Sequence, residues 1–350
     1  MSDDLNMSFG DEADEVLRSE PRGFAPEQMV ACDVCLRGNP PTRTSCLYCA
    51  APLPVNDASA ALRRPTLRQL EKWEQGFNVI LLPNENDFID EERLQKVSEL
   101  LRLNIEDLQR IMAAGVALPL ARAATVDEAE LIEQQLSAHG IKPVLIVADE
   151  ALGVERNFTK RVRALEFTED ELIVFPTGGG EAWRCAWGEV SLMVAGRHYV
   201  RQIEVEERKG RGSENEMLDA REMSADEALL DFYTTRDENG WRIGANNFDF
   251  SCLGEKKRLL ATENFALLIE TLRARAVEAE SDETYRSVRH ALGSVWTLEQ
   301  TTASQGLRRG SRPGRYNTEA VTTSDNETQF TRYSRLRHHL KLRRDTGTQA

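Results

Sequence analysis

Four cysteines between positions 32 and 49 constrain this chain more than any other feature. Cys32 and Cys35 form one Cys-x2-Cys pair, and Cys46 and Cys49 form a second pair further along the chain. Each pair predicts a tight turn that directs two sulfur atoms to one point, and two such turns supply the tetrahedral thiolate set that Zn²⁺ prefers. The segment between them is short and polar, so it needs a bound metal to fold. The sequence therefore predicts one structural zinc ion held by these four cysteines.

Two other chemistries are open for the same four residues. A rubredoxin-like iron site uses the same ligands, and an oxidising compartment would instead favour two disulfides. The remaining cysteines, Cys185 and Cys252, lie in apolar runs, which is typical of small buried side chains. This cysteine usage indicates a reducing compartment.

The pattern Cys-x2-Cys-x3-Asn-x6-Cys-x2-Cys, with Asn39 as its asparagine, resembles the Ran-binding-protein type of zinc finger. Members of that family bind single-stranded RNA or ubiquitin. Val30 stands where the RNA-binding members have a base-stacking Trp, and Leu36 begins the pair that is Thr-Phe in the ubiquitin-binding members. An RNA site in this region would lie around Arg37, Asn39 and Arg43. A generic zinc ribbon describes the cysteines equally well.

The length and the net charge of the chain limit the number of domains and the classes of protein to which it can belong. The chain has 350 residues, enough for two or three domains, and its formal net charge of -14 argues against bulk nucleic-acid binding. We find neither an apolar signal-peptide core near the N-terminus nor an apolar run long enough for a membrane span. We therefore expect a soluble, cytoplasmic protein without a membrane span.

Composition and periodicity predict a multi-domain α+β protein. The predicted parts, in chain order, are a disordered acidic arm (1–28), a zinc ribbon or zinc finger (29–54), a linker (55–66), a small α/β domain (67–149), a second domain (160–300) and a disordered basic tail (301–350). Both ends lack apolar periodicity, and their charges are opposite. We expect the tail to bind RNA weakly or to touch acidic parts of the same chain.

Residues 67–149 predict the order strand, helix, helix, strand, helix, strand. Asn104 and Thr125 are expected to cap the second and third helices. This order, the strand at 79–81 and the helix opening at Thr125 resemble the ClpS adaptor and the C-terminal domain of the ribosomal stalk protein. The resemblance to ClpS, which binds N-terminal amino groups, implies a ligand pocket with Asn84, Asp87 and Met112. Because the family's second-helix His is absent, we expect that this pocket does not bind N-terminal amino groups.

Residues 160–300 predict seven short strands followed by an amphipathic helix over 263–276, with a charged loop at 207–226 between strands. This topology resembles the pleckstrin-homology fold, in which a helix plugs one end of a bent barrel. The first hairpin mixes acidic and basic residues, so we expect it to bind protein rather than phosphoinositides. A further helix is expected over 282–299.

No catalytic motif is recognisable, and a closed four-cysteine cage leaves zinc no open position for a substrate. We therefore expect a non-enzymatic zinc-binding adaptor that acts through unidentified protein partners and has no small-molecule substrate. The alternative hypothesis is an RNA- or ribosome-associated regulator. Pull-down with and without ribonuclease separates the two, because protein partners of an adaptor survive the treatment.

Overall fold

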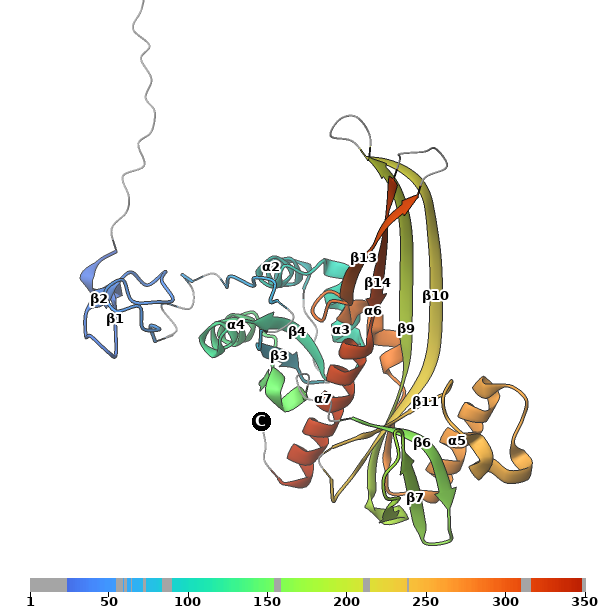
Figure 1. The fold of residues 1–350 in the computed structure, drawn as a ribbon. Coiled ribbons are helices and arrows are strands. Elements are labelled where there is room, and N and C mark those ends of the chain that lie inside the picture. The colour runs from blue at the N-terminus through green and yellow to red at the C-terminus, as the bar shows by residue number, and fades with distance from the viewer. Residues whose placement is uncertain are drawn as a thin grey trace, which may run out of the picture. The chain divides into compact units, whose positions relative to one another are not determined.

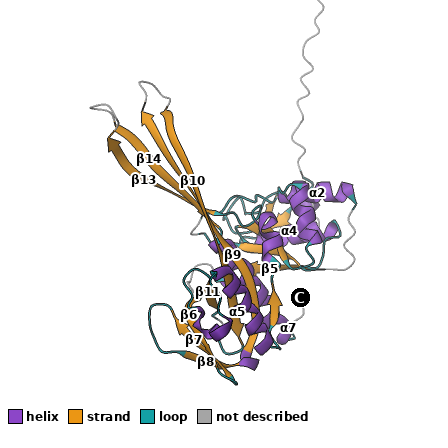
Figure 2. Ribbon diagram, turned by 90° about the vertical axis from the view of Figure 1, so that its right-hand side faces the viewer, coloured by secondary structure: helices purple, strands orange, loops and turns teal. Residues whose placement is uncertain are grey.

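The computed structural model describes residues 24–54, 59, 62–63, 65–71, 74–83, 90–153, 159–209, 215–237, 239–309 and 316–347. The chain divides into two compact units, Met1–Arg63 and Arg64–Ala350. The structure confirms a mixed α+β protein (Figures 1 and 2). It also confirms a cluster of four cysteines.

The first unit is a small irregular fold around the cysteines. It contains the 3-10 helix η1 (Pro26–Gln28) and the paired strands β1 (Val30–Ala31) and β2 (Gly38–Asn39). Arg63 is only 2% exposed, and its guanidinium donates to the carbonyl oxygens of Pro41, Leu53 and Pro54. The predicted boundary at residue 54 was therefore too early, because a residue assigned to the linker folds back on the cysteine-rich segment.

A three-stranded antiparallel sheet begins the second unit. Its order is β4 (Leu118–Ala123), β3 (Phe77–Leu81), β5 (Val144–Ala148). The sheet is accompanied by three helices, α2 (Glu91–Leu101), α3 (Ile105–Ala113) and α4 (Val126–Ala138). The side chains of Asn104 and Thr125 accept backbone N–H groups at the starts of α3 and α4, which satisfies donors that a helix start leaves free. The predicted element order and both predicted caps are confirmed.

A larger, curled sheet follows. Its strands run in the order β13 (Glu299–Arg309), β14 (Tyr316–Asp325), β9 (Val190–Lys209), β10 (Asn215–Thr234), β11 (Trp241–Gly244), β6 (Lys160–Phe167), β7 (Glu171–Pro176), β8 (Trp183–Ala186), and β12 (Glu280–Asp282) pairs with β9. Short 3-10 helices lie at Asp149–Leu152 (η2), Trp187–Glu189 (η3) and Phe250–Lys256 (η4). The longer helices are α5 (Ala261–Arg275), α6 (Tyr285–Leu292) and α7 (Glu327–Asp345).

Two local predictions in this region were wrong. The last of the seven strands expected from the sequence, over 248–253, is instead mostly helix η4, which begins where the Asp249 side chain accepts the N–H of Ser251. The loop expected at 207–226 belongs largely to the long antiparallel strands β9 and β10. Charged residues fit a sheet when opposite charges face each other, and here Arg201 pairs with Glu222 across the two strands, with Nε 2.8 Å from Oε1.

Strands β9 and β10 separate two hydrophobic cores. Side chains alternate between the two faces of a strand, so neighbouring residues enter different cores. On β9, Leu192 and Val194 face the core that includes β3 and helices α6 and α7, whereas Met193 faces the core closed by α5. The first of these cores joins the predicted 67–149 and 160–300 domains, and the structure therefore places them in one unit.

The C-terminal region overturns the prediction of a disordered tail over 301–350. Its residues 301–309, 316–325 and 327–345 belong to β13, β14 and α7, respectively. Phe330, Tyr333 and Leu336 recur every three residues along one face of α7 and are fully buried. The many arginines between them hide this apolar face in the sequence. Figure 1 shows α7 in red, as the last helix of the chain.

Three basic residues in the second half of α7 pair with acidic residues of the same chain. Nε of Arg337 lies 2.5 Å from Oδ2 of Asp282, and Nζ of Lys341 lies 3.1 Å from Oε1 of Glu280. Arg344 also contacts Glu280. Of the two roles expected for the tail, contact with acidic parts of its own chain is therefore confirmed for these residues.

Candidate metal centre

The four cysteines lie on two turns with the same backbone geometry. In the first, the N–H of Leu36 donates to the carbonyl of Cys32 at 2.8 Å, and the N–H of Cys32 donates to the carbonyl of Arg37 at 3.0 Å. In the second, the N–H of Ala50 donates to Cys46 at 3.0 Å, and that of Cys46 donates to Ala51 at 2.7 Å. Each turn therefore directs its two sulfurs inward by the same mechanism, as the two-pair spacing predicted.

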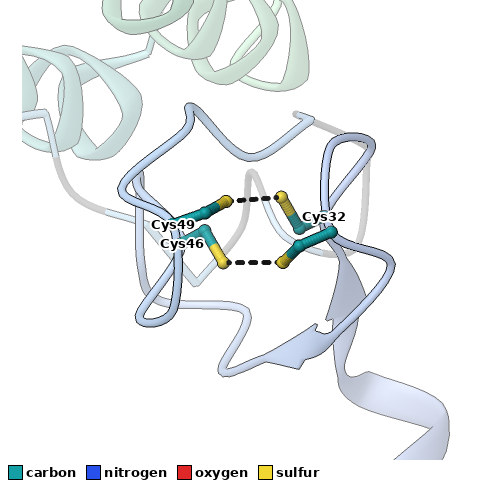
Figure 3. A group of neighbouring side chains, drawn as sticks. Cys32, Cys46 and Cys49 are labelled. Atoms are coloured by element: carbon teal, nitrogen blue, oxygen red, sulfur yellow. Dashed lines mark hydrogen bonds between the residues drawn. The ribbon is translucent and has the colours of Figure 1, made fainter.

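The sulfur atoms form a compact cluster (Figure 3). Sγ of Cys32 lies 3.6 Å from Sγ of Cys49, and Sγ of Cys35 lies 3.5 Å from Sγ of Cys46. All four sulfurs lie within 4.8 Å of one another. A zinc ion bound tetrahedrally at about 2.3 Å would separate its sulfurs by about 3.8 Å. The separations fit one four-coordinate ion and are far longer than a disulfide bond of about 2.0 Å.

Asn39 supports the cluster from inside the unit. It is fully buried, and its Nδ2 donates to the carbonyl of Arg37 at 2.8 Å and to Sγ of Cys46 at 3.5 Å. Its Oδ1 accepts the N–H of Leu47 at 2.8 Å, which ties the first turn to the second. Groups that hydrogen-bond to metal ligands orient them. The structure thus places Asn39 beside the ligands rather than on an exposed RNA-binding surface.

The surroundings of the cysteine thiols shift the pKa values of Cys46 and Cys49 in opposite directions. Burial raises the pKa of Cys46, but hydrogen bonds from backbone N–H groups of Tyr48 and Cys49, and contacts with Cys35 and Asn39, lower it to about 6. The pKa of Cys49 is raised to about 12, because burial and the three other cysteines outweigh a backbone hydrogen bond at Ala51. Metal ions bind thiolates, so binding here releases protons.

Both turns require a left-handed backbone directly after their second cysteine. Leu36 has φ 59° and Ala50 has φ 58°, a conformation that residues with a Cβ rarely adopt. Ala50→Gly is therefore expected to stabilise the metal-bound unit by about 0.5–1 kcal/mol, after the entropy of glycine is subtracted. Competition with a zinc chelator should show about two- to fivefold tighter metal retention.

Ala51 supplies the control for this prediction, because it follows Ala50 and has no positive φ. Ala51→Gly should not tighten metal retention. If both substitutions changed retention equally, the effect would not come from the left-handed backbone at Ala50.

The two turns also present large apolar side chains to solvent. Val34 and Leu36 on the first turn are 72% and 80% exposed, and Leu47 and Tyr48 on the second are 54% and 56% exposed. The guanidinium of Arg37 lies 4.7 Å from the centre of the Tyr48 ring, so the two turns meet at this contact. We call Val34, Leu36, Leu47 and Tyr48 the knuckle face. Sequence reasoning missed it, although the apolar residues within and after the Cys-x2-Cys pairs gave a signal.

The other predicted site residues are placed as follows. Arg37 and Arg43 are exposed on the first unit, and Nε of Arg43 donates to the carbonyl of Ser45. Met112 is half-buried and packs against the core of the second unit. Asn84 and Asp87 lie outside the described residues, so both the pocket that the ClpS resemblance implies and the expected lack of binding there stay predictions.

The two cysteines outside the cluster lie in apolar surroundings, as expected. Cys185 is 1% exposed and belongs to the core closed by α5, and Cys252 packs against the same core. Burial raises the pKa of the Cys185 thiol to about 12 and that of the Cys252 thiol to about 11. Both thiols are therefore protonated and unreactive near neutral pH.

Comparisons with family models, curated proteins and solved structures found no match to this chain. None of the helices in the described part of the chain combines the length and the apolar character that crossing a membrane requires.

Proposed function

We propose that this protein is a non-enzymatic, cytoplasmic adaptor whose zinc-bound unit binds a protein partner through the knuckle face. The observation that carries the proposal is the exposure of four large apolar side chains on turns held by the cysteine cluster. Exposed apolar groups that lie together mark interaction sites. A metal fixes the turns in advance, so less conformational freedom is lost on binding.

The second unit supports the same proposal through its element order. The order β3, α2, α3, β4, α4, β5 is the one that the resemblance to ClpS and to the ribosomal stalk domain implies. The curled sheet of β6 to β11 followed by α5 agrees with the pleckstrin-like resemblance. We propose both identities as interaction folds that would contact further partners.

An RNA- or ribosome-associated role is the second candidate. The exposed ring of Tyr48, with Arg37 beside it and Arg43 nearby in sequence, favours it because aromatic rings and guanidinium groups stack on bases. Two features favour protein binding instead. The side chain of Asn39 is used inside the unit, and Arg337 and Lys341 of the basic α7 are paired with carboxylates.

A pull-down with the zinc-loaded full chain tests the proposal. Leu36→Ser combined with Tyr48→Ser should weaken partner binding about thirtyfold or more, because buried aromatic anchors contribute at least about 2 kcal/mol to interfaces. The wild-type interaction should survive ribonuclease treatment. Zinc content should stay unchanged, since both side chains point to solvent.

Leu259→Ser is the matched control, because Leu259 is a fully exposed leucine in the second unit. It should leave partner binding unchanged. Binding that persists in the double variant would overturn the knuckle face as the site. Loss of the wild-type partners on ribonuclease treatment would favour the RNA-associated role.

A further inference from the structure

A cavity of about 710 Å³ lies in the second unit. It is bounded by residues 69–71, by residues 297–300 and by the first turns of α7. Two arginines line it, Arg122 from β4 and Arg332 from α7. Leu70 and Leu298 form an apolar part of the cavity wall.

Arg332 is the unusual member of this lining. The residue is 8% exposed, and its Nε is buried without a hydrogen-bond partner among the described residues. Oδ1 of Asp149 lies 3.9 Å from Nε of Arg332. That distance is too long for a hydrogen bond. The guanidinium of Arg332 therefore has an ion-pair partner but no hydrogen-bonded anion, and a buried charge is favourable only when hydrogen bonds also satisfy its donors.

The carboxylate of Asp149 already accepts hydrogen bonds from groups other than Arg332. It accepts the N–H of Gly76 at 2.9 Å, Nδ2 of Asn78 at 2.9 Å, and Nε and Nη2 of Arg122 at 2.9 and 2.5 Å. Asp149 therefore matches the charge of Arg122. Arg332 reaches the same carboxylate only at ion-pair distance, so two guanidinium groups share one hydrogen-bonded carboxylate. Burial lowers the pKa of Arg332 to about 10, although the carboxylates of Asp149 and Glu299 act in the opposite direction.

The other charges at the cavity limit what that anion can be. Glu71 and Glu299 also line it, and an oxygen of Glu299 accepts the hydroxyl of Thr328. Two carboxylates on the wall disfavour a dianion such as phosphate. A single carboxylate suits the planar guanidinium, which can donate two parallel hydrogen bonds to it.

We propose that this cavity binds a small monocarboxylate, whose charged end pairs with Arg332 beside Arg122 and whose apolar end contacts Leu70 and Leu298. This site is independent of the knuckle face. It also changes the expectation, drawn from the sequence, that the chain has no small-molecule ligand. The signal was absent from the sequence because the cavity joins residues from four separate segments of the chain.

Thermal unfolding of the full chain with isovalerate, acetate, inorganic phosphate and chloride at equal ionic strength tests the proposal. Isovalerate should raise the melting temperature in proportion to the logarithm of its concentration, as for any ligand specific to the folded state. Acetate should act more weakly because it lacks the apolar end. Absence of a shift with isovalerate, or a larger shift with phosphate, would overturn the proposal.

Arg332→Met adds a second test, since it keeps the pair of Asp149 with Arg122. The ligand-free variant should melt at the wild-type temperature or above, and the isovalerate shift should be lost. Arg344→Met on the same helix is the control: Arg344 contacts Glu280 outside the cavity, so the shift should be kept. An undiminished shift in Arg332→Met would contradict the site. Should Arg332→Met fail to fold, Arg332→Lys, which keeps the charge but loses the planar fork, should reduce the shift.

Discussion

Deletion of residues 326–350, which removes α7, is expected to unfold the unit that spans residues 64–350. Phe330, Tyr333 and Leu336 fill the core shared by β3, β9, α6 and α7. Loss of one large core side chain costs about 2–5 kcal/mol, and a typical domain has about 5–15 kcal/mol of stability in total. Removal of three such side chains together therefore exceeds the stability that most domains possess.

The same deletion leaves buried polar groups without partners. Asp282 is 6% exposed and accepts the hydroxyl of Tyr333 at 2.9 Å, and Arg337 lies beside it. Trp296, fully buried, receives a hydrogen bond on its carbonyl from Gln329 at 2.9 Å. Leaving such groups buried and unpaired adds a penalty to the loss of packing.

Circular dichroism and calorimetry of the truncated chain would check this expectation. Deletion of residues 346–350, beyond the end of α7, is the control and should leave the melting transition unchanged. A truncated chain that kept the wild-type transition would instead support a dispensable C-terminal tail, as the sequence alone suggested.

The contrast between the two ends of the chain shows which features the sequence could predict. Cys32, Cys35, Cys46 and Cys49 were found because metal ligation by paired cysteines depends on local spacing. The helices and strands of residues 77–148 were predicted because their apolar residues repeat at short, regular intervals in the sequence. α7 was missed because charged residues separate its buried ones, and its partners lie far away in the chain.

Long-range pairing accounts for the rest of what was missed. Nε1 of Trp296 donates to Oδ1 of Asn78 at 2.8 Å, although 218 positions separate the two residues. The same Asn78 donates to Asp149, whose carboxylate accepts hydrogen bonds from Arg122 of the cavity lining. No local pattern carries such information, so neither the joining of the two predicted domains nor the cavity could be read from the sequence.

Cys32→Ser is expected to abolish metal binding and unfold the first unit without changing the melting transition of the second. Among the described residues, the core of the first unit contains only four buried apolar residues, and two of them are the predicted metal ligands Cys32 and Cys46. Zinc binding contributes about 10–16 kcal/mol to the folding of comparable zinc-finger peptides, so a fold this small depends on it. The melting transition of the second unit should not change, because its two cores share no residue with the core of the first unit.

Elemental analysis should give one zinc per wild-type chain and none for Cys32→Ser, while limited proteolysis should newly cleave within residues 29–63. Cys252→Ser is the control, because Cys252 packs against the core closed by α5 and should not affect zinc. Acidification should act like the mutation, since protons compete with the metal for thiolates and the stability from zinc is lost as the pH falls. Iron in place of zinc would contradict the assignment of the metal, and loss of the second unit's transition would contradict the independence of the two units.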